Sequence, residues 1–363
     1  PAGLGTTGTQ RMWQCAGKVS GRKGPVSISL TDLSGFDGRC DAVYFTTEED
    51  DIPPSGAAEL AAFRKRMLGI PEVPQAAESF DFVVVGGGVA GMCAAAAASR
   101  LGCNVALVND RPVLGGNNSS EIRVHLGGVI ELGPNEGRGR MIREFGHSRQ
   151  GNAQPAGNYE DAKKSAFIAA EENVKLFANC RAVAVNKEGD RITSVIIRHI
   201  ETGEETTLEA PLFADCTGDG TVGFLAGADF RRGRESRDEF GETLAPSSAD
   251  LTTSGAAVQW YSTDAGRKTE FPRFSYGVEF NESNCERVTM GEWKWETGMN
   301  LDQVYDFERI RDYGLLVIYS NWSFLKNGLR NNEKFRNREL GWVAYVAGKR
   351  ESRRLLGDYV LKQ

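Results

Sequence analysis

Three glycines with a functional spacing lie between two short apolar runs. Gly86, Gly88 and Gly91 form the pattern G-x-G-x-x-G directly after the apolar residues 82–85. A run of small residues follows them, and a second apolar run occupies residues 105–108. This order predicts a strand, a tight turn, a helix and a second strand within about 30 residues, which is the context of a dinucleotide-binding turn.

The glycines have separate physical roles in such a turn. Gly86 permits a sharp change of direction, Gly88 lets the backbone approach a pyrophosphate, and Gly91 lets the helix touch the strand. The first helical residues, Val89 and Ala90, present free N–H groups and the positive end of the helix dipole to phosphates. The alternative is a glycine-rich turn that binds nothing.

A second turn of the same kind follows the apolar residues 212–215. Thr217, Gly218 and Asp219 come directly after this run, and a short segment of small residues follows. The order again predicts a strand, a turn and a helix, which makes these three residues candidates for cofactor binding. We interpret the preceding Cys216 as a packing residue rather than a redox thiol.

Residues 121–126 alternate between polar and apolar side chains. In a strand, Glu121, Arg123 and His125 would share one face. Three ionisable groups close to a cofactor turn are catalytic candidates, with His125 as a base and Arg123 as a cation that holds a bound molecule. The alternative is a solvated or salt-bridged strand face. His199 lies in an expected hairpin and is assigned no role.

Composition limits the class of protein. The chain has 363 residues and a formal net charge of −6, which allows two or three domains and argues against nucleic acid as a partner. No apolar run reaches the length needed to span a membrane. The seven cysteines never occur as C-x-x-C, so the spacing predicts no zinc or iron–sulfur site.

The composition and the residue patterns along the chain suggest five segments. Residues 1–50 have strand and turn patterns typical of part of a β-sandwich, and residues 51–80 form a linker with one helix at 57–67. Residues 81–230 carry both nucleotide turns, and between the turns the patterns predict a helix at 162–173 and strands at 174–177, 182–185, 192–200 and 205–208. Residues 231–335 form an inserted, β-rich substrate domain, and residues 336–363 contain a long helix that returns from it.

The inserted segment is rich in aromatic residues. Such side chains could be platforms for the apolar faces of sugar rings, or they could be core. The residues concerned are Trp260, Tyr261, Phe271, Phe274, Tyr276, Trp293 and Trp295.

Several segments together resemble one family, the FAD-dependent oxidoreductases. Residues 109–116 resemble the R-x-x-x-G-G extension that follows the second strand in FAD-binding two-domain flavoproteins. Residues 86–91, 109–126, 211–227, 230–246 and 341–358 also resemble segments of this family. Bacterial members carry an N-terminal β-sandwich of carbohydrate-binding type. Some bear a xanthan-lyase-like label, but nothing in this chain indicates the helical toroid of a lyase.

The resemblance implies an α/β fold in which a Rossmann-like domain binds FAD. It adds Asn109, Asp110, Arg111, Gly115, Gly116, Asn117 and Ser119 to the cofactor-binding residues. The family has an acidic residue at the end of the second strand, where this chain has Asn109, although an amide can still hydrogen-bond a ribose hydroxyl. In the family, a later strand and helix start close over the flavin; we expect this chain to be truncated at both ends.

The implied function is hydride transfer from an alcohol carbon of a sugar or polyol-like substrate to flavin. His125 would take the hydroxyl proton, and Arg123 would hold the substrate or flavin. Two alternatives stay open, a redox-neutral polysaccharide lyase or hydratase and a carbohydrate-binding protein that has lost its flavin. The expected partner is a small molecule or a glycan. Compartment and oligomeric state do not follow from the sequence.

Overall fold

A computed structural model divides the chain into two compact units, residues 1–73 and residues 74–363. It describes residues 13–21, 23–31, 40–76, 79–127, 137, 139–146, 151–273 and 276–362.

The first unit contains one of the predicted elements. Helix α1, Ala57–Leu68, matches the helix expected at 57–67 and ends at Gly69, whose φ of 67° is left-handed. Its buried Phe63 packs edge-on against Tyr44, with ring centroids 5.3 Å apart.

The strands expected in residues 1–50 are not formed where the structure describes this segment. Residues 13–21, 23–31 and 40–50 contain no assigned strand, and Val26 and Ile28 are exposed at 61% and 60%. A short apolar run needs partner strands to complete its hydrogen bonds, and the described residues of this unit offer none. The expectation of a partial β-sandwich is therefore not confirmed.

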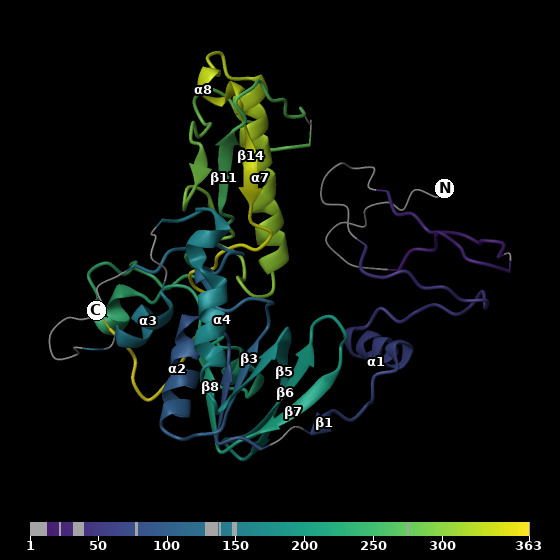
Figure 1. The fold of residues 1–363 in the computed structure, drawn as a ribbon, viewed down its shortest axis with the longest axis vertical. Helices are drawn as coiled ribbons and strands as arrows, with labels where there is room; N and C mark the ends of the chain where they lie inside the picture. Colours follow the sequence, from purple (N-terminus) through teal and green to yellow (C-terminus); the bar gives the residue numbers. More distant parts are fainter. Residues whose placement is uncertain are drawn as a thin grey trace. The chain divides into compact units, whose positions relative to one another are not determined.

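The second unit is built on a parallel sheet of four strands in the order β4-β3-β2-β8, of which Figure 1 labels β3 and β8. These strands are β2 (Phe82–Val85), β3 (Val105–Asn109), β4 (Val174–Ala178) and β8 (Leu212–Asp215). All four were predicted as strands. Val85 is in register with both Val108 and Asp215, so the two glycine turns begin at the same edge of the sheet.

One face of this sheet is covered by helices. Helix α2, Val89–Arg100, follows the first turn as predicted and packs Met92 and Ala95 against Val84 and Leu107. Helix α4, Asp161–Ala169, was also predicted, and it contributes Phe167 and Ile168 to the same core together with the short α3, Arg140–Phe145.

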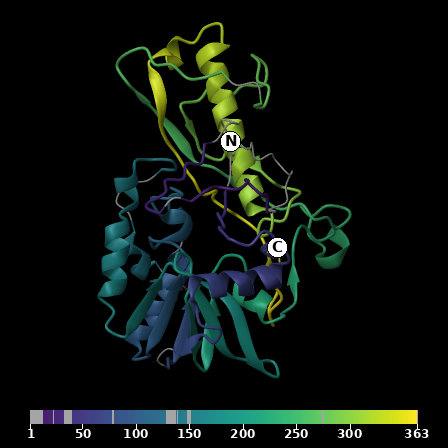
Figure 2. The ribbon, with the colours of Figure 1, turned by 90° about the vertical axis from the view of Figure 1, so that its right-hand side faces the viewer.

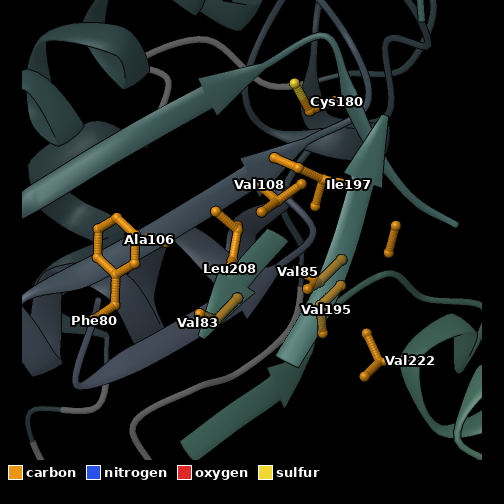
Figure 3. Close-up of a cluster of buried hydrophobic side chains, with 11 residues drawn as sticks. Phe80, Val83, Val85, Ala106, Val108, Cys180, Val195, Ile197, Leu208 and Val222 are labelled. Atoms are coloured by element: carbon orange, nitrogen blue, oxygen red, sulfur yellow. The ribbon is translucent and has the colours of Figure 1, made fainter. Parts of the chain in front are cut away.

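A second sheet covers the other face. It has the order β1-β7-β6-β5, with β1 (Gln75–Ala76), β5 (Cys180–Glu188), β6 (Arg191–His199) and β7 (Glu205–Glu209). Figure 3 shows Val83, Val85 and Val108 of the parallel sheet facing Val195 and Ile197 of β6. Because the central strands β2 and β3 are buried on both faces, residues 82–85 and 105–108 are continuously apolar rather than alternating.

The region after β8 begins with a short helix and extended pieces. Helix α5, Thr221–Leu225, follows the second turn as expected. Strand β9 (Phe230–Arg231) and helix α6 (Arg237–Phe240) come next. The remaining strands of this region are β10 (Ala256–Ala257), β11 (Trp260–Asp264), β12 (Met290–Gly291) and β13 (Glu296–Thr297).

The largest element of the inserted region is a helix that the sequence did not suggest. Helix α7, Phe307–Asn327, packs Ile310, Ile318 and Trp322 against Val258 and Trp260, at the opposite end of this unit from the parallel sheet (Figure 2). Its buried face also carries polar residues, which interrupt the apolar stripe used to recognise a helix. The region is therefore mixed rather than β-rich. No helix among the described residues is long and apolar enough to cross a bilayer.

The long helix expected at 340–361 is wrong. Residues Arg338–Val343 form strand β14, which pairs antiparallel with β11, and Arg354–Leu355 form β15, which pairs with β9. The apolar residues here have helical spacing, but Gly341 and Gly348 weaken a helix. The backbone of Gly348 instead exchanges two hydrogen bonds with Ala257, at 2.8 and 3.1 Å.

Lys326 fixes the end of α7. The residue is 8% exposed, and its ammonium nitrogen lies 2.7 to 3.0 Å from Thr269 Oγ1 and from the carbonyl oxygens of Phe335, Arg336 and Arg338, which share its three N–H donors. These contacts join α7 to the short α8, Glu333–Arg336, and to the start of β14.

We expect Lys326→Met to lower the free energy of unfolding by about 2–4 kcal/mol, because it keeps the aliphatic stem but leaves buried carbonyls without a donor. Chemical denaturation of both proteins would measure the change. The exposed Lys334 on α8 gives the control, since Lys334→Met should stay within about 0.5 kcal/mol of wild type. Equal effects of the two substitutions would contradict this account.

Candidate functional site

The first turn contains glycines that the surrounding backbone requires. Gly86 has a φ of 114°, and a Cβ there would overlap the carbonyl of Cys216 and lie 2.8 Å from the nitrogen of Thr217. A Cβ at Gly91 would overlap the carbonyl oxygen of Gly86. The turn can therefore lie directly against the backbone that follows β8 only because both positions lack side chains.

The N-terminus of α2 is open to an anion. Gly88 is its N-cap, no side chain caps it, and its first turn has no acidic residue. The first intrahelical bond runs from the nitrogen of Met92 to the carbonyl of Gly88, at 2.9 Å, so the N–H groups of Val89, Ala90 and Gly91 have no intrahelical acceptor. These predicted residues fit a pyrophosphate.

The predicted Gly115 and Gly116 form a second backbone turn against the first. Their φ values are 111° and 58°, and the nitrogen of Gly115 donates to the carbonyl of Gly87 at 2.9 Å. A Cβ at Gly116 would lie 3.2 Å from the Cα of Gly88. A Cβ at Gly115 would meet the stem of the buried Lys164 at 2.9 Å. The turn from Gly86 to Gly91 and the turn formed by Gly115 and Gly116 thus line the start of α2.

The residues after β3 turn inward. Asn109 is 5% exposed, and its Nδ2 donates to the carbonyls of Arg111 and Val113 at 2.7 and 3.0 Å. The amide therefore holds its own loop together. Asp110 is half exposed, with a carboxylate oxygen 3.8 Å from the guanidinium of Arg181.

Arg111 belongs to a polar group that the sequence did not connect. Its Nε donates to the buried carboxylate of Glu121 at 2.6 Å, and the hydroxyl of Tyr345 donates to the other oxygen of Glu121. The pKa of Tyr345 is raised by desolvation and by this hydrogen bond to Glu121. The group joins the loop after β3 to the segment after β14.

The predicted Asn117 and Ser119 lie just after the turn formed by Gly115 and Gly116. Asn117 Nδ2 donates to the carbonyl of Lys349 at 2.8 Å. Ser119 is 1% exposed, and its Oγ has no hydrogen-bond partner among the described residues. The neighbouring Asn118 donates to the carbonyl of Val124 at 2.8 Å.

The turn after β8 is held by its own side chains. Thr217 Oγ1 donates to Asp215 Oδ1 at 2.6 Å, and Asp215 Oδ2 accepts from the nitrogen of Val222 at 2.7 Å. The predicted Gly218 has a φ of 75°. The predicted Asp219 is ion-paired with Lys349, and its Oδ1 lies 2.8 Å from the hydroxyl of Ser352.

The strand expected at 121–126 is wrong. Residues 121–122 are in a turn and 123–127 have no regular structure, and Arg123 has a left-handed φ of 66°. Hydrogen bonds from the nitrogen of Arg123 to the carbonyl of Ser119 and from that of Val124 to Asn117, at 2.8 and 2.9 Å, fold the segment back. The side chains at 121, 123 and 125 therefore do not share one face.

Arg123 packs between the two halves of this unit. Its guanidinium lies 3.6 Å from the ring centroid of Trp342 and donates to the carbonyls of Ser120 and Gln154 at 2.8 and 3.2 Å. The residue is 7% exposed. Two of its N–H donors therefore bind carbonyls of the protein itself, and a cation over an aromatic ring stabilises the junction.

His125 is held by Asn152. The backbone nitrogen of His125 and its ring Nδ1 lie 3.0 and 2.9 Å from the same oxygen, Oδ1 of Asn152. A backbone N–H can only donate, so the side-chain atom that faces it must be the amide oxygen. Nδ1 therefore also donates and carries the proton, which leaves Nε2 as the basic nitrogen of the neutral ring.

Of the six described aromatic residues in the predicted set, three pack in the core of the inserted region, whereas Tyr276 is 46% exposed. Trp260 is 1% exposed and stacks on Trp295, with ring centroids 6.4 Å apart, and Phe271 packs against the same cluster. Phe274 lies outside the described residues. Packing is therefore the better of the two interpretations for these three rings, and they form no open platform.

Four residues at this site escaped the sequence prediction, namely Asn152, Tyr345, Lys349 and Ser352. The last three lie in the segment that was expected to be helical, where charges would have faced solvent. Asn152 is far from His125 in any local pattern. The one available signal was Gly348, a weak point in the expected helix.

We expect Gly91→Ala to lower the free energy of unfolding by about 1–3 kcal/mol, because the methyl group would push α2 away from β2. The same change should weaken the binding of ADP, measured by calorimetry. Gly157, which has nothing within 4 Å of an added Cβ, gives the control. If Gly91→Ala behaves like Gly157→Ala, the close approach of helix and strand does not constrain the site.

We also expect Cys216 to react slowly with iodoacetamide in the folded protein. Burial, and then the charge of Asp215, raise the pKa of its thiol, so less thiolate is present at pH 8. Peptide mass spectrometry should show labelling at least about tenfold slower than at the exposed Cys15 and Cys40. Equal rates after unfolding in urea are the control. Rapid labelling of native Cys216 would contradict its interpretation as a packing residue.

Solved flavoproteins are similar to parts of this chain. An L-proline dehydrogenase from P. horikoshii is 19% identical, with 39% of this chain and 23% of that one covered, at a TM-score of 0.25. The monooxygenase PieE, solved with FAD and substrate, is 17% identical, with 53% and 36% covered and a TM-score of 0.32. The myxobacterial halogenase CndH is 17% identical, with 54% and 46% covered and a TM-score of 0.33.

The chain spans less than half the length of each of these three proteins. No curated protein matches it. The model of the family described as FAD dependent oxidoreductase matches residues 81–363, which include both glycine turns and the inserted region. The chain therefore belongs to the FAD-dependent oxidoreductase family.

Proposed function

We propose that this FAD-dependent oxidoreductase removes a hydride from an alcohol carbon of a sugar or polyol-like substrate, with His125 as the base. One observation carries the proposal, the contact with Asn152 that selects one tautomer of the His125 ring. Because Asn152 Oδ1 accepts from Nδ1, the neutral ring can accept a proton only at Nε2. An alcohol needs such a base, since its O–H proton must leave as the C–H hydride is transferred.

FAD is the cofactor, and when bound it accepts the hydride. Within the proposal, the N–H groups of Val89, Ala90 and Gly91 hold the pyrophosphate, and the two glycine turns allow it to approach the backbone. The oriented dipoles of these N–H groups are in place before the cofactor arrives, so binding requires little rearrangement of the turn.

In the proposal, Arg123 is a positioning residue. Its guanidinium is held by Trp342 and by two carbonyls, and its own carbonyl accepts from the nitrogen of Ala153 at 2.9 Å, next to Asn152. It therefore joins the loop that carries His125 to the loop that carries Asn152. We propose that it holds this pair in register rather than contacting substrate.

The class of substrate rests on the resemblance to family members that carry an N-terminal β-sandwich of carbohydrate-binding type. The buried tryptophans give no support to an aromatic sugar platform. What favours an alcohol is the tautomer of His125, because a ring protonated at Nδ1 can accept at Nε2 the one O–H proton that alcohol oxidation releases.

We expect His125→Ala to keep FAD bound but to slow its reduction by substrate about 10²–10⁴-fold, the usual contribution of a general base. The measurement is anaerobic bleaching of the flavin absorption band after a panel of sugars and polyols is added. Asn152→Leu should also slow reduction, because the ring would no longer be confined to one tautomer.

His199 supplies the matched control. Its Nδ1 accepts from the nitrogens of Glu201 and Thr202 at 3.3 and 3.2 Å, in the hairpin between β6 and β7. His199→Ala should leave the rate of reduction unchanged. If His125→Ala reduces its flavin as fast as wild type, the base lies elsewhere, and if no sugar or polyol bleaches the wild-type flavin, the proposed substrate class is wrong.

A further inference from the structure

A short segment after β14 crosses the edge of the parallel sheet. It runs between the turn formed by Gly115 and Gly116 and the turn that follows β8. Residues 349–352, here called the crossing segment, are anchored at both ends. At one end, the carbonyl of Lys349 accepts from Asn117 Nδ2 at 2.8 Å. At the other end, the hydroxyl of Ser352 lies 2.8 Å from Asp219 Oδ1 and 3.1 Å from the carbonyl of Gly218.

Both anchor points lie beside the start of α2. Gly116, which precedes Asn117, approaches the Cα of Gly88, the N-cap of that helix. Asp219 belongs to the turn that starts with Cys216, whose carbonyl lies against Gly86. The crossing segment therefore joins the two turns that flank the open N–H groups of α2.

The ammonium group of Lys349 has contacts here, but the side chain stays partly exposed to solvent. It forms an ion pair with Asp219, its Nζ lies 4.6 Å from the ring centroid of Phe307, and its side chain is 23% exposed. Asp219 also has the hydroxyl of Ser352 beside its other oxygen. Asp219 would thus keep one partner if the ammonium group turned elsewhere.

The pyrophosphate of a dinucleotide needs more positive charge than the first turn provides. It carries about two negative charges, whereas the end of a helix dipole supplies about half a positive charge. The turn from Gly86 to Gly91 has no cationic side chain. Arg111, the cation predicted on the cofactor side, is paired with the carboxylate of Glu121.

We propose that Lys349 is a cofactor-binding residue whose ammonium group passes from Asp219 to the pyrophosphate of FAD, so that the crossing segment closes over the bound cofactor. This rests on the FAD-dependent function proposed above. The exchange replaces one ion pair by another, and a charge-assisted contact to a phosphate is stronger than one between neutral groups.

Binding of three probes by the full chain tests the proposal. FAD and ADP both contain the pyrophosphate, and riboflavin lacks it. Lys349→Ala should weaken FAD and ADP about tenfold, the loss of one such contact, and leave riboflavin unchanged. Lys349→Arg should stay within about threefold of wild type because it keeps the charge. ADP binding should also depend less on salt in Lys349→Ala.

Lys187 gives a charge-matched control. It is an exposed lysine of β5, and Lys187→Ala should change none of the three affinities. If Lys349→Ala fails to fold, judged by circular dichroism, Lys349→Gln keeps the aliphatic stem and a polar end and is used in its place.

Two results would overturn the proposal while the proposed function stands. One is wild-type affinity of the Lys349 variant for FAD and ADP. The other is an equal loss for riboflavin, which would show that the lysine only supports the segment. Wild-type protein that binds neither FAD nor ADP would instead overturn the proposed function, and this inference with it.

Discussion

The direct contact between backbone turns at one edge of the parallel sheet is the constraint on which the rest of this unit depends. Gly86 lies against the carbonyl of Cys216, and Gly116 lies against Gly88. The register of β2 with β3 and β8 brings these turns to one edge, because all three strands run in the same direction. Any side chain at Gly86 or Gly116 would separate the turns and remove the cradle for a pyrophosphate.

Most of the polar side chains described around this edge form contacts with other residues of the protein. Asn109 closes its own loop, Glu121 holds both Arg111 and Tyr345, and Arg123 is held by Trp342. Such contacts fix the loops before a cofactor arrives, so less conformational entropy is lost when it binds. His125 differs from these residues because its Nε2 has no described hydrogen-bond partner, and this is why the proposed chemistry is assigned to it.

The C-terminal end of the inserted region connects it to the edge of the parallel sheet at which the glycine turns lie. Strand β14 must pair with β11 to complete the small sheet under α7, and this pairing sends the following residues back toward the glycine turns. The crossing segment therefore belongs to both parts. A shift of the inserted region would be passed on to Lys349 and Ser352, since only residues 344–348 separate β14 from Lys349 and Gly348 is itself bonded to Ala257.

The sequence by itself determined the elements whose rules are local. The β2–turn–α2–β3 unit, α1, α4, β5 to β8 and α5 were all predicted, because apolar runs and glycine spacing act within a few residues. Tertiary structure alone decided the rest. Residues 338–343 form a strand because β11 is beside them, Arg123 takes a left-handed φ where Trp342 packs on it, and α7 buries polar residues that find partners far away in sequence. Lys349 entered the site for the same reason, since its place depends on the pairing of β14 with β11, whose residues, such as Trp260 opposite Val343, lie far apart in sequence and which no local pattern reveals.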